Sequence, residues 1–124
     1  MSDWYKSAIQ PGDQTGSKYV YPTINLDPSV LPTDTERGVY ASQVKWGKQT
    51  YQGALYFGPR VVKQETNDVL EIYLLDFAGH KAIEAVEFTL AQFLRGVMDF
   101  PDLKALREQV TRDIEDVRKA LNEK

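Results

Sequence analysis

An almost unbroken apolar run, Val-Leu-Glu-Ile-Tyr-Leu-Leu-Asp-Phe, occupies residues 69–77. Its β-branched and aromatic residues favour a β-strand, and side chains alternate between the two faces of a strand. One face carries Val69, Glu71, Tyr73, Leu75 and Phe77, and the other carries Leu70, Ile72, Leu74 and Asp76. Since both faces are apolar, the strand predicts a closed barrel or a sandwich with a further element packed outside it.

The C-terminal residues predict that outer element. Gly and Pro are absent from Asp102 onward, and apolar residues recur at steps of three and four: Leu103, Leu106, Val110, Ile114, Val117 and Leu121. This spacing places them on one stripe of an amphipathic helix over residues 102–122. Asp102 is the expected N-cap, because its side-chain oxygen can accept a hydrogen bond from an N–H group of the first turn.

The preceding hundred residues are rich in Tyr, Val, Gly and Pro, which favour short strands and tight turns. Gly38–Trp46 and Gln49–Phe57 flank Gly47-Lys48, which predicts a hairpin with a two-residue turn. Weaker strand patterns lie near Tyr19–Tyr21, Val61–Glu65 and Glu84–Leu90. Residues 1–124 are therefore predicted to form one mainly β domain, with a barrel over about residues 1–100 and the helix outside it.

Composition narrows the classes of function. The 124 residues carry 15 Lys and Arg against 18 Asp and Glu, a formal net charge of −3. This balance argues against binding nucleic acid through its phosphates and against a polybasic membrane anchor. The chain has no Cys and one His, which excludes thiolate chemistry, disulfides and His-rich metal sites. The charge balance leads us to expect no nucleic-acid partner. No signal-peptide order or membrane-spanning run is evident, so we also expect a cytoplasmic protein without a membrane partner. A barrel covered by its own helix is also expected to be a monomer.

Glu71 is a carboxylate in the middle of an apolar strand face. Burying an unpaired carboxylate is costly, and buried carboxylates with a raised pKa serve as general bases. The alternatives are an ion pair across the barrel and a place in water at the barrel mouth.

A second candidate region precedes that strand. Gly12 and Gly16, followed by Lys18, could present backbone N–H groups and a cation to phosphates, although two loop glycines usually mean turns. Thr23 and Asn25 are two residues apart on one face of an extended segment and could share a hard cation with phosphate oxygens. The alternative interpretation makes them turn residues.

Several short motifs follow one another at characteristic spacing. They are Gly12 and Gly16, Pro22-Thr23-Ile24-Asn25, Gly38-Val39-Tyr40-Ala41, Leu70-Glu71, Leu75-Asp76-Phe77, Leu94-Arg95, Phe100, Leu106 and the helical Asp113. As an ordered set they resemble the riboflavin kinase family, which includes the kinase part of bifunctional bacterial flavin synthetases. The resemblance covers nearly the whole chain and implies a six-stranded antiparallel Greek-key barrel with a C-terminal helix packed outside.

The resemblance also implies a role for each candidate residue. The chain would transfer the ATP γ-phosphate to the 5′-hydroxyl of riboflavin, giving FMN and ADP. Thr23 and Asn25 would hold Mg²⁺ and the nucleotide phosphates, and the loop of Gly12, Gly16 and Lys18 would cover those phosphates. Glu71 would accept the hydroxyl proton, and Arg95 would contact the flavin. FAD synthesis is not expected, since 124 residues leave no room for an adenylyltransferase domain.

The chain departs from the family pattern at Ser7, Val20, Ile24, Val61-Val62 and Ala82-Ile83. The changes at Ser7 and Val20 replace glycines and would stiffen a loop that must approach phosphates. The pattern fits a divergent active kinase, and it also fits a non-catalytic flavin- or nucleotide-binding module on the same barrel. A barrel that only contacts proteins is the third interpretation.

Overall fold

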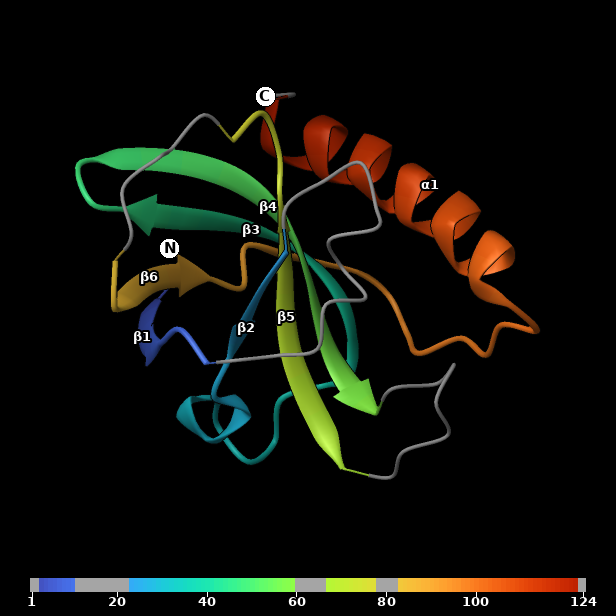
Figure 1. Ribbon diagram of the computed structural model, residues 1–124, viewed down its shortest axis with the longest axis horizontal. Helices are drawn as coiled ribbons and strands as arrows, with labels where there is room; N and C mark the ends of the chain where they lie inside the picture. The colour runs from blue at the N-terminus through green and yellow to red at the C-terminus, as the bar shows by residue number, and fades with distance from the viewer. Residues whose placement is uncertain (1–2, 11–22, 60–66, 78–82, 123–124) are drawn as a thin grey trace.

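The computed structural model describes residues 3–10, 23–59, 67–77 and 83–122. Within them the chain forms seven strands, one short 3-10 helix and one α-helix (Figure 1). The strands are β1 (Trp4–Ala8), β2 (Thr23–Leu26), β3 (Gly38–Trp46), β4 (Gln49–Pro59), β5 (Asp68–Leu74), β6 (Ala85–Thr89) and β7 (Gln92–Arg95). The 3-10 helix η2 spans Pro28–Val30, and α1 spans Leu103–Asn122.

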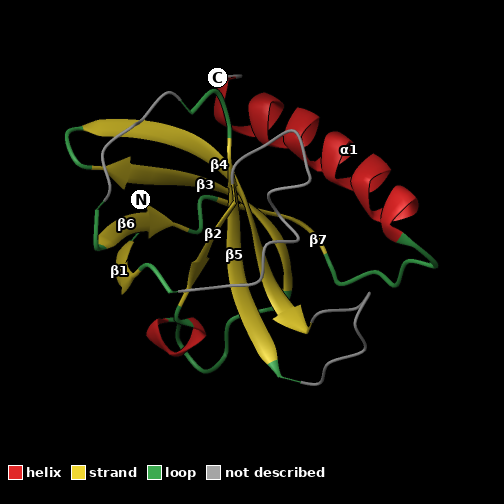
Figure 2. Ribbon diagram, viewed as in Figure 1, coloured by secondary structure: helices red, strands yellow, loops and turns green. Residues whose placement is uncertain are grey.

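The strands form one curled antiparallel sheet. Six of them follow the order β1-β6-β3-β4-β5-β2, in which β2 returns to lie beside β5 as in a Greek key. The mainly β fold with a C-terminal helix is confirmed. The seventh strand, β7, was not predicted; it pairs with the first residues of β3 and lies beside α1 (Figure 2). The predicted hairpin is also confirmed, with Gly47 at φ +59° in the turn between β3 and β4.

The two ends of the six-stranded path meet at a seam between β1 and β2. The N–H of Gln10 donates to the carbonyl of Asn25 at 2.7 Å, and the two residues form a bridge. Nearby, the Oγ of Ser7 accepts a hydrogen bond from the N–H of Asp27 at 2.9 Å and donates to the carbonyl of Ala8 at 2.8 Å. The serine that departs from the family pattern therefore helps to close the sheet.

Replacing Ser7 by alanine is expected to lower the free energy of unfolding by about 1–3 kcal/mol, because the N–H of Asp27 would lose its acceptor in the seam. The shift of the urea midpoint at constant m-value measures this loss. Thr50→Ala, at an exposed position of β4, is the control and should change stability by less than about 0.5 kcal/mol. Equal losses in the two variants would show that the Ser7 hydrogen bond does not stabilise the seam.

Both faces of β5 are buried from Ile72 to Leu74, as the sequence predicted, whereas Val69 and Glu71 on the outer face are half-buried. On the inner face Leu70, Ile72 and Leu74 join the main core cluster. On the outer face Tyr73, with the following Leu75, packs against α1 through Val110, Ile114 and Val117. The helix therefore covers one side of the sheet, as Figure 1 shows.

Two details of the predicted packing are wrong. Asp76 adopts a left-handed conformation with φ +54°, so the strand ends before Phe77. The ring of Phe77 turns back to the inner core, with its centroid 4.9 Å from that of Trp46. At the start of α1, Leu103 is 39% exposed rather than part of the packed stripe.

The ends of α1 are fixed by polar contacts. Asp102 caps it, accepting a hydrogen bond from the N–H of Ala105 at 2.9 Å, as predicted. Arg118 forms an ion pair with Asp76 in the turn after β5, at 2.8 Å. No helix within the described residues is long and apolar enough to cross a membrane.

Candidate functional site

Two of the candidate side chains and one tyrosine form a row across adjacent strands. Asn25 on β2 lies directly opposite Glu71 on β5, and Glu71 lies directly opposite Tyr56 on β4. Residues opposed in this way point to the same face of a sheet, with their Cβ atoms about 5 Å apart. All three are half-buried. The sheet thus brings together a carboxamide, a carboxylate and a phenol from three separate segments.

The row lies on the outer face of the sheet, next to the area that α1 covers. Tyr73 follows Glu71 on the same face of β5, and Ala54 precedes Tyr56 on the same face of β4. Both Tyr73 and Ala54 pack against α1. The row of Asn25, Glu71 and Tyr56 lies next to them on the same face. Glu71 is therefore neither inside the barrel nor under the helix.

Thr23 lies on the same face as Asn25 and opposite Tyr73. Its hydroxyl and the Asn25 carboxamide are oxygen donors of the kind that Mg²⁺ accepts beside waters and substrate phosphates. These residues fit a cation that is held largely by a nucleotide. The described residues contain no group of three or more His, Cys, Asp or Glu that could bind a metal by itself.

The hydroxyl of Tyr56 is coupled electrostatically to the carboxylate of Glu71. Burial raises the pKa of its hydroxyl to about 12, the charge of Glu71 adds to the increase, and the charge of Arg95 opposes it. The hydroxyl donates to the carbonyl of Pro59. Tyr56 is therefore neutral at physiological pH and held in one orientation.

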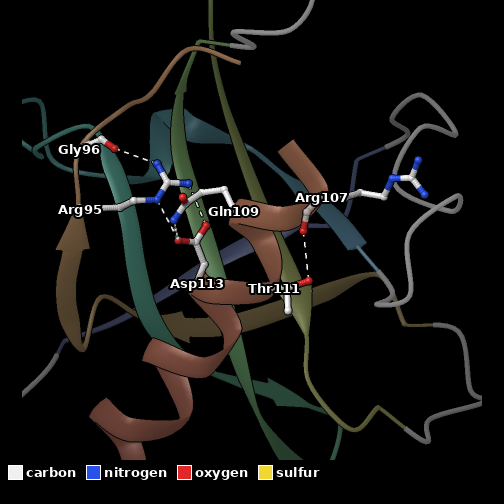
Figure 3. A network of polar contacts seen from close by, with 6 residues as sticks. All are labelled: Arg95, Gly96, Arg107, Gln109, Thr111 and Asp113. Carbon is white, nitrogen blue, oxygen red and sulfur yellow. Dashed lines mark hydrogen bonds and ion pairs between the residues drawn. The ribbon is translucent and has the colours of Figure 1, made fainter. Parts of the chain in front are cut away.

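Arg95 lies at the end of β7 and is tied to α1. Its Nε and Nη2 donate to the two carboxylate oxygens of Asp113, each at 2.8 Å, and its Nη1 donates to the carbonyl of Gly96 at 2.9 Å (Figure 3). Gln109 donates to the same carboxylate at 3.0 Å. Asp113 is only 4% exposed, so this ion pair is largely removed from water.

Arg95 therefore has a structural role that the sequence did not predict. The guanidinium fixes the start of the segment between β7 and α1, and the flavin contact expected of Arg95 stays a prediction. The expected phosphate loop of Gly12, Gly16 and Lys18 lies outside the described residues, as do Val20, Val61-Val62 and Ala82. Tyr56 was missed as a site residue, because its place beside Glu71 depends on the pairing of β4 with β5.

The chain is similar to several riboflavin kinase sequences. The Flavokinase family model, described as riboflavin kinase, matches residues 4–121. The bifunctional riboflavin kinase/FMN adenylyltransferase of Buchnera aphidicola is 31% identical over 90% of this chain and 36% of its own length. The RNA-binding riboflavin kinase RibR of Bacillus subtilis is also 31% identical, over 90% of this chain and 48% of its own length. The chain thus spans between a third and a half of these curated relatives.

A solved structure shares this fold. The crystal structure of riboflavin kinase from Trypanosoma brucei matches with a TM-score of 0.60 at 19% identity, over 97% of this chain and 80% of that one. The family model covers nearly the whole chain, including the row of Asn25, Glu71 and Tyr56. The chain therefore belongs to the riboflavin kinase family.

Proposed function

We propose that this chain transfers the γ-phosphoryl group of ATP to the 5′-hydroxyl of riboflavin, producing FMN and ADP. The observation that carries the proposal is the direct opposition of Asn25 and Glu71 across β2 and β5. It puts an oxygen ligand for a cation and phosphates next to a carboxylate that can take a proton. The family to which the chain belongs supports the choice of riboflavin as the acceptor.

In the proposed reaction the carboxylate of Glu71 accepts the proton of the 5′-hydroxyl. The freed oxygen forms a bond to the γ-phosphorus, and the bond between that phosphorus and the bridging oxygen of ADP breaks. Thr23 and Asn25 would hold Mg²⁺ beside the phosphates, and the ion would supply positive charge that neutralises them. Phosphoryl transfer depends mainly on such positioning and charge neutralisation, so few protein groups are needed. Gly12, Gly16 and Lys18 are assigned to cover the phosphates, and Arg95 to the flavin side.

Several departures from the family pattern lie away from the row, which favours catalysis over a non-catalytic binding module. Ile24 points to the inner face, where it joins the core. Ser7 closes the seam, and Ile83 packs against the core. None of these three side chains is part of the outer face on which Thr23, Asn25 and Glu71 lie.

The test is to incubate the purified protein with riboflavin, ATP and Mg²⁺ and to separate riboflavin from FMN by chromatography. We expect FMN to form and its formation to stop when EDTA removes the cation. Quenching of riboflavin fluorescence without FMN would instead support the non-catalytic module. Size-exclusion chromatography of the same sample tests the proposal that the protein works as a monomer.

A further inference from the structure

The two edges of β2 are held in different ways. On one side all four of its residues pair with β5. On the other side two hydrogen bonds cross the seam to β1 and the residues that follow it. The N–H of Gln10 donates to the carbonyl of Asn25 at 2.7 Å, and the N–H of Asp27 donates to the Oγ of Ser7 at 2.9 Å. The strand that carries the proposed cation ligands therefore depends on the seam as well as on β5.

The main-chain carbonyl of Asn25 points across the seam and away from Glu71. In an antiparallel strand the N–H and the carbonyl of one residue point to the same neighbouring strand, and those of the next residue point to the opposite one. Since the carbonyl of Asn25 accepts from Gln10, Asn25 and Glu71 oppose each other without a main-chain hydrogen bond between them. Such pairs bring the side chains close together, with Cα atoms about 4.5 Å apart. The place of Asn25 beside Glu71 is thus fixed by its neighbours in β2 and by the bond to Gln10.

β1 is a firm support for these two bonds. It pairs with β6 along its whole length, and the N–H of Ile9 continues this pairing by donating to the carbonyl of Glu84 at 2.8 Å. Ser7 is only 3% exposed, and its Oγ donates to the carbonyl of Ala8 at 2.8 Å, which fixes the orientation of the hydroxyl. The oxygen is therefore held ready to accept from the N–H of Asp27, directly after the last residue of β2.

We propose that the hydroxyl of Ser7 and the N–H of Gln10 are positioning groups for the cation and phosphate side of the site. They hold β2 against β1, so that the carboxamide of Asn25 stays opposite the carboxylate of Glu71. This inference rests on the function proposed above, since it takes Thr23 and Asn25 as the groups that hold Mg²⁺ and the phosphates. Ser7 stands where the family pattern has a glycine, which has no hydroxyl. This chain therefore supports β2 through a contact of its own.

The test measures two affinities in the wild-type protein and its variants: the Kd for Mg²⁺-ATP by titration calorimetry, and the Kd for riboflavin by fluorescence quenching without ATP. Ser7→Ala removes the acceptor of the Asp27 N–H. It should raise the Kd and the KM for Mg²⁺-ATP by about 10-fold, the lower end of the effect of groups that orient metal ligands. The Kd for riboflavin should stay close to the wild-type value, because Thr23 and Asn25 are assigned to the nucleotide side.

Thr89→Val is the matched control for a general loosening of the sheet. The Oγ1 of Thr89 accepts from the N–H of Gln43 at 2.9 Å, and Thr89 is only 2% exposed. It therefore makes the same kind of buried bond as Ser7, but between β6 and β3, away from β2. Thr89→Val should lower the urea midpoint by about as much as Ser7→Ala does and should leave the Kd for Mg²⁺-ATP unchanged.

A second pair of variants tests the bond to Asn25 itself and decides the question where Ser7→Ala does not fold. Gln10→Pro removes the N–H that the Asn25 carbonyl accepts, whereas Gln10→Ala keeps the N–H and changes only an exposed side chain. We expect Gln10→Pro to weaken Mg²⁺-ATP binding by about 10- to 100-fold. Gln10→Ala should bind Mg²⁺-ATP like the wild type.

Each outcome separates this inference from the kinase proposal. If the wild type makes FMN and Ser7→Ala and Gln10→Pro bind Mg²⁺-ATP normally, the seam only stabilises the fold and the kinase stands. Weaker Mg²⁺-ATP binding in these two variants, in a protein whose wild type makes no FMN, would support the inference and reject the kinase. Equal losses of Mg²⁺-ATP and riboflavin affinity, or a similar loss in Thr89→Val, would show a general loosening and overturn the inference. A wild type that does not bind Mg²⁺-ATP would also overturn it.

Discussion

Glu71→Gln is expected to lower the rate of FMN formation by about 10²–10⁴-fold, the usual contribution of a positioned general base. Glutamine keeps the shape of the side chain and the pairing of β5 with β2 and β4, but it cannot take the hydroxyl proton. The loss should fall on kcat and kcat/KM alike, because the proton is transferred only as the reaction proceeds. Riboflavin binding, measured by fluorescence quenching, should change much less.

Two further variants test the position of the Glu71 carboxylate and provide a control. Glu71→Asp keeps the charge but withdraws the carboxylate by one methylene, and a displacement of about 1 Å in an active site can cost about 10²-fold. Glu87→Gln removes a carboxylate from an exposed position of β6 and should leave the rate unchanged. Wild-type rates in Glu71→Gln would show that another group takes the proton, and that Glu71 serves only the packing of the sheet.

The sequence predicted the elements whose signal is local. The apolar residues on both faces of residues 69–77 indicated burial on both sides, and α1 with Val110 and Ile114 provides the outer cover. The N-cap at Asp102 and the hairpin at Gly47 were predictable because each depends on neighbours in the chain. Phe77 was misplaced because alternation assumes a continuing strand, whereas the left-handed Asp76 ends it.

The candidate site depends on contacts that no local pattern encodes. The sequence marked Asn25 and Glu71 separately, and the family resemblance placed both in one reaction. Their direct opposition follows from β2 lying beside β5, which is a long-range property of the Greek key. The same holds for Tyr56, which the sequence presents as one aromatic residue among many. The pairing of β4 with β5 makes it the neighbour of Glu71.

Asp113→Asn is expected to cost about 3–5 kcal/mol in the free energy of unfolding, the usual cost of breaking a buried ion pair. The change would leave the guanidinium of Arg95, whose side chain is only 18% exposed, without its charged partner. Urea unfolding at constant m-value gives the free energy directly. Asp116→Asn removes an exposed carboxylate from the same helix, and its cost should stay below about 0.5 kcal/mol.

A double variant separates the effect of the Arg95–Asp113 ion pair on stability from its effect on riboflavin binding. Replacing Arg95 by Met and Asp113 by Leu leaves no buried charge at this site. The double change should be less destabilising than either single change. The double variant would still lack the guanidinium that is assigned to the flavin side, together with its hydrogen bond to the Gly96 carbonyl. We therefore expect it to recover stability but not riboflavin affinity. Recovery of both stability and riboflavin affinity in the double variant would show that the ion pair stabilises α1 without positioning the site. If Asp113→Asn is as stable as the wild type, the ion pair contributes nothing to the stability of the fold.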